Sequence, residues 1–510
     1  MQVKDETSYH SDLSRVAKNA GISGIGEIIF NILAYTTNIV MTRTVGPAIY
    51  GIFNLANNIT NSAQIISASG PGHGLLRFVA YYKGKKDFPR LKGAIIFGTK
   101  VSFILSLLLA ICIFYLSDFV AVKIFHNAEV GKAIKILMIS LPFLTLGTIW
   151  LESIQSFQVI KYFVFTKKIL QPISRLVVII TLFLVGLKLV GILIASIISA
   201  MVGFFFAFYY LIKVSSVHKK LPVPIYERKE IVSFSLPLSF IAYLSVITLY
   251  TDSLMLGYFM STFEVGIYAA VARLALLIEL PLTSFNNIFG PMISEFYSRN
   301  EMGKLEDLFK VVTKWVFTLS LPVYLILVLF AQQIIGIFGH DFEVGAVALI
   351  IYGAGELINA VTGASGTIIM MTGRPKINLL NSIAFGLCIV MLNYFLIPKY
   401  GIIGAAAATG FAIALINILK VLQVYLILRI HPYKLNYLKP IIAGLLSLLI
   451  VALIRGNLQS VSISMAILFL LLFLASYGLF LYLFKFEEED QYILQLIRQK
   501  LNNVYKNKFK

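Results

Sequence analysis

The sequence predicts an all-α polytopic membrane protein with fourteen transmembrane helices. Of its 510 residues, 58% are hydrophobic and 13% are charged, and the mean hydropathy is +0.86. A soluble domain is nearer a quarter charged. The apolar residues also fall in runs of about 20 or more, the length that crosses a bilayer as a helix. The basic residues gather in alternate loops, so the net charge of +19 reflects membrane orientation and not a nucleic-acid partner.

The apolar runs place the spans, whose boundaries rest on hydropathy alone. The predicted spans are residues 20–44, 47–69, 91–116, 131–157, 164–186, 189–213, 229–255, 261–290, 308–332, 343–371, 376–397, 401–428, 436–454 and 462–484.

The distribution of Lys and Arg orients these spans. Of the 43 Lys and Arg residues, 32 lie in the two termini or in and beside every second loop, and seven lie on the opposite side. Basic residues are retained on the cytoplasmic side. We therefore expect both termini in the cytoplasm of a cell in whose plasma membrane the protein is embedded.

An internal repeat divides the chain into two lobes. Residues 50–53 (YGIF) correspond to residues 265–268 (VGIY), about two hundred residues later. Each repeat holds an even number of helices, so the two are parallel and related by a pseudo-twofold axis along the membrane normal. The expected organisation is a cytoplasmic N-terminal segment, a first six-helix lobe, a basic cytoplasmic linker, a second six-helix lobe, two extra helices and an amphipathic cytoplasmic tail, at residues 1–19, 20–215, 216–228, 229–430, 436–485 and 486–510.

Neither catalysis nor a cofactor is predicted. Because residues 1–20 are polar, we do not expect them to act as a cleavable signal peptide. Cys112 and Cys388 lie in different apolar runs and fit small core residues. The sequence contains no nucleophile elbow, no phosphate-binding glycine loop and no metal-ligand spacing. We therefore expect a protein that is not an enzyme and that binds no metal or cofactor.

Amide side chains follow one face of each of the first two spans. A lipid chain cannot hydrogen-bond a carboxamide, so these faces must meet protein or water. Hydrogen bonding between packed helices is one interpretation, and a hydrated substrate cavity is the one that two adjacent polar faces favour. The predicted cavity residues of this kind are Asn31, Asn38, Asn54, Asn57, Asn58 and Asn61, with Tyr243 in the second lobe.

Charged side chains within the spans are functional candidates, because each costs about 2.5–3.5 kcal/mol at the centre of a membrane helix. Arg273, about twelve residues into its span, is the first candidate for binding an anion, followed by Arg43 and Arg175. A guanidinium group matches the geometry of phosphate. The acidic residues predicted to bind a coupling ion, either H⁺ or Na⁺, are Glu27, Asp252, Glu279 and Glu356.

Several motifs together resemble the polysaccharide repeat-unit (Wzx-type) flippases. This family shares a superfamily with the lipid II flippases and the multidrug and toxic compound exporters. The resemblance covers about residues 14–485. It is carried by Asp252, Asn393 and residues 42–47 (TRTVGP), 50–53, 77–85 (RFVAYYKGK), 235–237 (SLP), 256–258 (LGY), 265–268, 372–376 (TGRPK) and 397–406 (IPKYGIIGAA).

The resemblance implies a V-shaped two-lobe exporter fold and a function. Such a protein would carry a polyprenyl-pyrophosphate-linked oligosaccharide across the plasma membrane by alternating access, for cell-surface polysaccharide biosynthesis. Its expected partners are that substrate, membrane lipids, a coupling ion and other proteins of polysaccharide assembly. The main alternative is an ion-coupled exporter of small amphipathic or cationic compounds, and a membrane-embedded glycan polymerase is a third class. In-membrane arginines and two extra helices favour the flippase.

Overall fold

The computed structural model describes residues 2–157, 159–215, 223–455 and 463–484, and within these residues the regular structure is helical throughout. The chain forms two compact units. Unit 1 holds residues 1–270, 337–342 and 389–405, and unit 2 holds residues 271–336, 343–388 and 406–510, as far as these are described. The lobe boundaries predicted from the repeat stay predictions.

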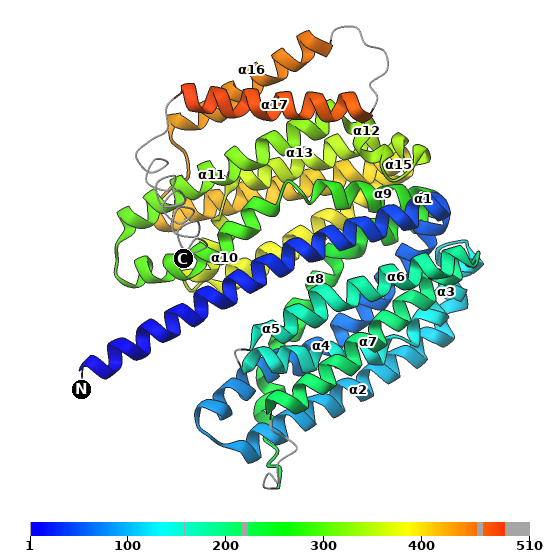
Figure 1. Ribbon diagram of the computed structural model, residues 1–510, viewed down its shortest axis with the longest axis vertical. Coiled ribbons are helices and arrows are strands. Elements are labelled where there is room, and N and C mark those ends of the chain that lie inside the picture. Colours follow the sequence, from blue (N-terminus) through cyan, green and yellow to red (C-terminus); the bar gives the residue numbers. More distant parts are fainter. Residues whose placement is uncertain (1, 158, 216–222, 456–462, 485–510) are drawn as a thin grey trace, which may run out of the picture. The chain divides into compact units, whose positions relative to one another are not determined.

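The helices follow one another along the chain with short connections (Figure 1). In order they are α1 (Gln2–Gly84), α2 (Phe88–Phe119), η1 (Val120–Ile124), α3 (Ala128–Met138), α4 (Leu141–Ser156), α5 (Ile160–Phe163), η2 (Val164–Leu170), α6 (Gln171–Leu184), α7 (Leu189–Ser215), α8 (Arg228–Phe259), α9 (Thr262–Ala275), α10 (Leu280–Ser298), α11 (Met302–Leu329), α12 (Ala331–Gly336), η3 (His340–Gly345), α13 (Ala346–Thr362), α14 (Ser365–Met371), α15 (Pro375–Leu428), η4 (Leu435–Tyr437), α16 (Leu438–Arg455) and α17 (Ile463–Leu483).

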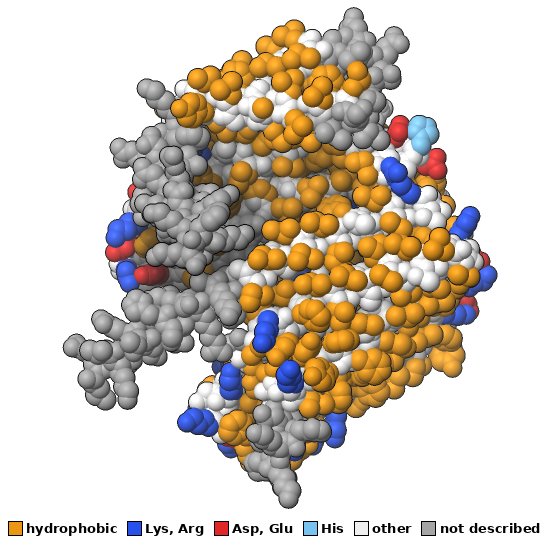
Figure 2. Space-filling model, viewed as in Figure 1, with side chains coloured by type: hydrophobic (Ala, Val, Ile, Leu, Met, Phe, Trp, Pro, Cys, Tyr) orange, Lys and Arg blue, Asp and Glu red, His pale blue; other side chains and the backbone are white. Residues whose placement is uncertain are grey.

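The protein is a multi-pass membrane protein. Eight helices of the described chain are long and apolar enough to cross a bilayer, or ten when each bent pair counts as one span. In the view of Figure 2, hydrophobic side chains cover the α2 and α7 face of unit 1 as a broad band. Such a continuous apolar surface is a membrane-facing surface, because in water it would drive association. The predicted total of fourteen spans stays a prediction.

Two pairs of predicted spans are joined without a loop. In α1 the break is Gly46, with φ 73° and ψ 175°, and in α15 it is Gly401, with φ 54°. Only glycine adopts such conformations at low cost, which explains why the chain reverses at these positions. The second arm of α1 continues to Gly84, so the predicted end of this span at residue 69 was too early.

Other predicted spans are broken where they were expected to be continuous. The predicted span 131–157 consists of α3 and α4, bent by 47°, and the span 261–290 contains α9 and the start of α10, bent by 51°. Pro142 and Pro281 lie in the first turns of α4 and α10, since proline cannot continue the preceding helix. The span 343–371 breaks at Gly363, which has φ 60°. The predicted tail at 486–510 and residues 216–222 of the linker lie outside the described residues.

A charged cluster in unit 1 fixes the start of α8 to the turn between α1 and α2. Arg90 pairs with Asp87 at 2.6 Å and with Glu227 at 2.5 Å, and the Tyr82 hydroxyl also donates to Glu227. The hydrogen bond from Tyr82, followed by that from Arg90, lowers the pKa of Glu227, and hydrogen bonds from Arg90 lower the pKa of Asp87. Both carboxylates are therefore charged at neutral pH and hold this connection in place.

The two copies of the repeat meet in unit 1 through a reciprocal contact of glycines. A Cβ on Gly51 would lie 1.7 Å from the Thr262 carbonyl oxygen, and a Cβ on Gly266 would lie 2.0 Å from the Pro47 carbonyl oxygen. The second arm of α1 and the first turns of α9 therefore cross backbone against backbone, as small residues allow in membranes. One repeat hairpin consists of the two arms of α1, and the other consists of α8 and α9. Each presents its corresponding glycine, Gly51 or Gly266, to the other, which is the pattern of a twofold-related contact.

Candidate functional site

A buried polar cluster of unit 1 centres on Asp252. Its carboxylate accepts hydrogen bonds from the Tyr268 hydroxyl at 2.8 Å and from the Asn393 amide at 2.7 Å. The exposed fractions of the three side chains are 8%, 1% and 0%. A buried carboxylate is tolerated only where donors satisfy it. Helices α8, α9 and α15 supply one residue each, so this cluster joins segments 141 residues apart in sequence.

Asn393 also contributes its side-chain oxygen. It is buried and accepts no hydrogen bond from the described residues. Together with the two carboxylate oxygens of Asp252, it makes three side-chain oxygen atoms of the type that hard cations and protons bind. Asp252 is thus the predicted acidic residue with the most complete binding environment in unit 1.

The other predicted acidic residues occupy different surroundings. Glu27 is half exposed and forms an ion pair with Lys168 at 2.7 Å. In unit 2, Glu356 is 3% exposed and accepts a hydrogen bond from Asn359 at 3.3 Å. The four coupling-ion candidates therefore do not form one site within either unit.

Glu279 belongs to a charged cluster of unit 2 that also contains Glu356 and Lys420. It lies close enough to both residues to interact with them electrostatically. The Lys420 ammonium group also donates to the Asn417 amide oxygen at 3.2 Å. Sequence reasoning left Lys420 out of the site. The signal that could have found it is the same one that selected Arg273, a charge in the middle of an apolar helix.

The amide residues of α1 divide into two groups. The Asn38 amide oxygen accepts a hydrogen bond from the Tyr50 hydroxyl at 2.9 Å, and the Asn54 amide donates to the Tyr50 carbonyl at 2.7 Å. The first of these bonds joins the two arms of α1, as expected of interhelical hydrogen bonding. The second lies within the second arm, which follows Gly46. Asn58 is also buried, whereas Asn31, Asn57 and Asn61 are half-buried. A hydrated face at these last positions stays a proposal.

The predicted cavity arginines are divided between the two units. In unit 1, Arg43 donates to the Ile337 carbonyl at 2.8 Å, and the Arg175 guanidinium lies 5.1 Å from the centre of the Phe53 ring. In unit 2, Arg273 is half-buried in the last turn of α9, immediately before the bend to α10. Tyr243 is a half-buried residue of α8 in unit 1, with its ring 6.1 Å from that of Phe240.

A second polar group of unit 1 was missed by sequence reasoning. The Gln64 amide donates to the Thr148 hydroxyl at 2.8 Å, and the Lys167 ammonium group donates to the same hydroxyl at 3.5 Å. Glu152, one turn along α4, interacts electrostatically with Lys167. Both lysines of the pair Lys167 and Lys168 lie in the π-helical segment η2, a conformation that is frequent at functional sites.

Taken together, the helices define a multi-pass membrane protein fold that carries buried polar groups. The structure is similar to the lipid II flippase MurJ in an inward closed conformation, with a TM-score of 0.72 and 16% identity, covering 90% of this chain and 98% of MurJ. The chain belongs to the family described as "Polysaccharide biosynthesis protein", whose model matches residues 16–297. The MatE family model also matches residues 237–395.

Two relatives illustrate the range of similarity. A protein of Haloferax volcanii that carries the name of a low-salt glycan biosynthesis flippase, Agl15, is 25% identical over 169 residues, which are 33% of this chain and 36% of that protein. A protein of Shigella flexneri that carries the name of an O-antigen transporter is 22% identical over 78% of this chain and 95% of its own length. The first match thus spans about a third of its relative.

Proposed function

We propose that this protein moves a polyprenyl-pyrophosphate-linked oligosaccharide across the plasma membrane by alternating access, for the biosynthesis of a cell-surface polysaccharide. The proposal rests on one observation above all. A chain of the polysaccharide biosynthesis family carries hydrogen-bonding and charged side chains inside its apolar helices, as in the buried cluster of Asp252, Tyr268 and Asn393. Such groups are costly in a membrane unless they serve a polar ligand or a coupling ion.

Each part of this substrate has a matching set of residues. Arg273, with Arg43 and Arg175 next, would bind the pyrophosphate, because guanidinium groups donate pairs of hydrogen bonds to phosphate. The half-buried amides and Tyr243 would bind sugar hydroxyls. Asp252 with the Asn393 oxygen is the leading site for H⁺ or Na⁺, and the Glu279 and Glu356 cluster is the second. Turnover would then be transport without covalent chemistry, in concert with the enzymes that build and polymerise the repeat unit.

Deletion of the gene is expected to leave the lipid-linked oligosaccharide on the inner leaflet and to remove the polysaccharide from the cell surface. The measurement is extraction of lipid-linked saccharides from right-side-out and inverted membrane vesicles, with a glycosidase that reaches one leaflet only. A plasmid copy of the gene is the control. If the deletion instead increases sensitivity to small cationic compounds and leaves the lipid-linked pool unchanged, the multidrug exporter alternative, which the MatE match favours, replaces this proposal.

The membrane orientation gives a second prediction. We expect a cysteine placed at the exposed Ser261, between α8 and α9, to react with an impermeant maleimide in intact cells, and a tag inserted after Val223 to be accessible only after permeabilisation. The reason is that the excess of basic residues lies on the side of the predicted spans that contains Val223, opposite to Ser261. Cys112 and Cys388 are first replaced by alanine to remove background labelling. The reverse labelling pattern would show that the orientation is inverted.

A further inference from the structure

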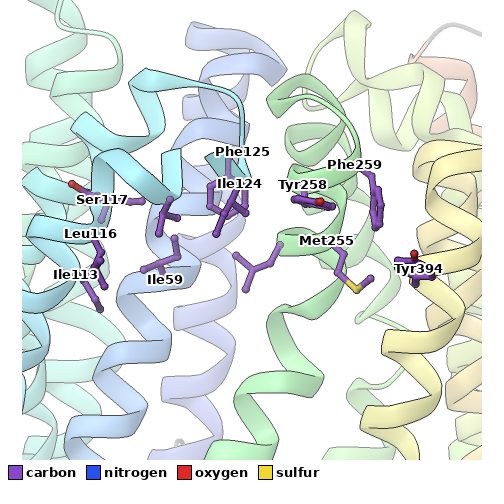
Figure 3. Close-up of a pocket in the computed structure, with 13 residues that line it drawn as sticks. Ile59, Ile113, Leu116, Ser117, Ile124, Phe125, Met255, Tyr258, Phe259 and Tyr394 are labelled. Atoms are coloured by element: carbon purple, nitrogen blue, oxygen red, sulfur yellow. The ribbon is translucent and has the colours of Figure 1, made fainter. Parts of the chain in front are cut away.

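Unit 1 contains an apolar pocket that none of the proposed polar roles uses. Its volume is about 520 Å³, within the range of about 300–1,000 Å³ that is usual for ligand sites. Among the lining residues, Phe125 and Ile134 are buried, and Tyr258 and Tyr394 are exposed. Figure 3 shows side chains of α2 facing those of α8 across this space, so the walls come from different helices.

The wall of the pocket is suited to hydrocarbon. Every lining side chain is aliphatic or aromatic except Ser117, whose hydroxyl already donates to the Phe114 carbonyl at 2.6 Å. The π-helical segment η1 forms part of the wall and directly follows α2. Of the lining rings, that of Phe259 lies 4.8 Å from that of Tyr258 and 5.9 Å from that of Tyr394. These three rings connect α8 with α15.

Residues of the pocket and of the buried polar cluster are near neighbours along the same helices. Leu254 and Met255 of the lining follow Asp252 by two and three residues in α8, and Tyr394 directly follows Asn393 in α15. The lining residue Ile59 lies between the amide residues Asn58 and Asn61 of α1. Helices α1, α8 and α15 therefore each carry polar groups and, within one turn of them, residues that line the apolar pocket. A ligand that meets both must be amphipathic.

We propose that this pocket binds the aliphatic chain of the lipid-linked substrate, a polyisoprenoid, while the polar head lies against the polar residues of the same helices. This inference rests on the proposed function. A bilayer is as apolar as the pocket, so transfer of a hydrocarbon chain alone supplies little free energy. Occupancy must then depend on the shape of the branched chain and on the pyrophosphate-linked head group. An ordinary phospholipid has neither of these.

Photo-crosslinking of the wild-type protein tests the occupant without requiring transport. Two probes are reconstituted separately, a lipid-linked disaccharide with a diazirine in its isoprenoid chain and a phosphatidylglycerol with a diazirine in its acyl chain. We expect the first probe to label peptides containing residues 113–125 and 254–259, and an excess of unlabelled lipid-linked disaccharide to suppress this labelling. Labelling of these peptides by the phospholipid alone, or labelling that the disaccharide does not suppress, would overturn the proposal.

Filling the pocket tests its role in translocation. In vesicles, Met255→Trp or Ile113→Trp is expected to slow translocation of the full-length substrate on the order of tenfold, a loss of about 1.4 kcal/mol, and to spare a short-chain citronellyl analogue. The matched controls are Leu249→Trp and Leu108→Trp, whose side chains are exposed on the same two helices, α8 and α2. Equal effects on both substrates, or none, would contradict the pocket assignment. If the wild-type protein moved neither substrate, the proposed function would fail, and the crosslinking result would still decide what the pocket binds.

Discussion

Replacing Arg273 by alanine is expected to abolish export of the lipid-linked oligosaccharide while the variant remains in the membrane at wild-type abundance. A guanidinium group donates two charge-assisted hydrogen bonds to a phosphate, each contributing about 1.5–3 kcal/mol, so the loss is on the order of a hundredfold or more. Arg273→Lys should recover only part of the activity, because an ammonium group lacks the planar pair of donors. Export is measured as surface polysaccharide in the deletion strain, normalised to protein abundance.

The competing role for Arg273 is structural. It lies in the last turn of α9, where a cation stabilises a helix end by about 0.3–1 kcal/mol. In that case Arg273→Ala would lower abundance, and the remaining protein would export at the normal specific rate. Arg299→Ala is the matched control, since Arg299 is exposed and forms only an i,i+4 ion pair with Glu295. Normal export by a stably expressed Arg273→Ala variant would exclude the proposed pyrophosphate contact.

Replacing Gly51 by alanine is expected to lower the free energy of unfolding by about 1–3 kcal/mol, the usual cost of overpacking a close contact. The new methyl group would lie 1.7 Å from the Thr262 carbonyl oxygen and 2.9 Å from the Gly266 nitrogen. Both atoms belong to the backbone, so neither can rotate away, and the two repeat hairpins must separate. The measurement is thermal unfolding in detergent, followed by the loss of monodisperse protein on size-exclusion chromatography.

Gly24→Ala is the control for this substitution, because Gly24 lies in the same helix and has no atom within 4 Å of an added Cβ. Alanine favours a helix over glycine by about 0.5–1 kcal/mol, so this variant should unfold at the wild-type temperature or above it. A Gly51→Ala variant as stable as Gly24→Ala would show that the hairpins do not need backbone contact at this position.

Much of the fold could be predicted because the bilayer imposes it locally. Helices were expected wherever apolar runs of about 20 residues occur, and the structure is helical there, since a chain in lipid must satisfy its own backbone groups. The breaks were harder to predict. Pro142 and Pro281 were visible in the sequence, but a proline ends one membrane helix and only bends another, and neighbouring helices determine which.

The site was predicted in part. Composition and position selected Asp252, Glu279 and Arg273 as charges that an apolar helix carries at a cost. Both Asn38 and Asn54 bond within α1, and their interpretation as cavity residues stays a prediction. The sequence indicates the face of one helix on which a side chain lies. It does not indicate whether that face meets water or the next helix.

By itself, then, the sequence determined the membrane class, the repeated hairpin and the cost of each in-membrane charge, because these depend on local hydrophobicity and spacing. Only the tertiary structure decided the partners. It placed Tyr268 and Asn393, which are 16 and 141 residues away in sequence, on the carboxylate of Asp252, and it brought Lys420 close to Glu279, 141 residues away. A buried charge is stabilised by whichever donors or opposite charges the packing of distant helices brings to it, and no pattern within a single helix records which these are.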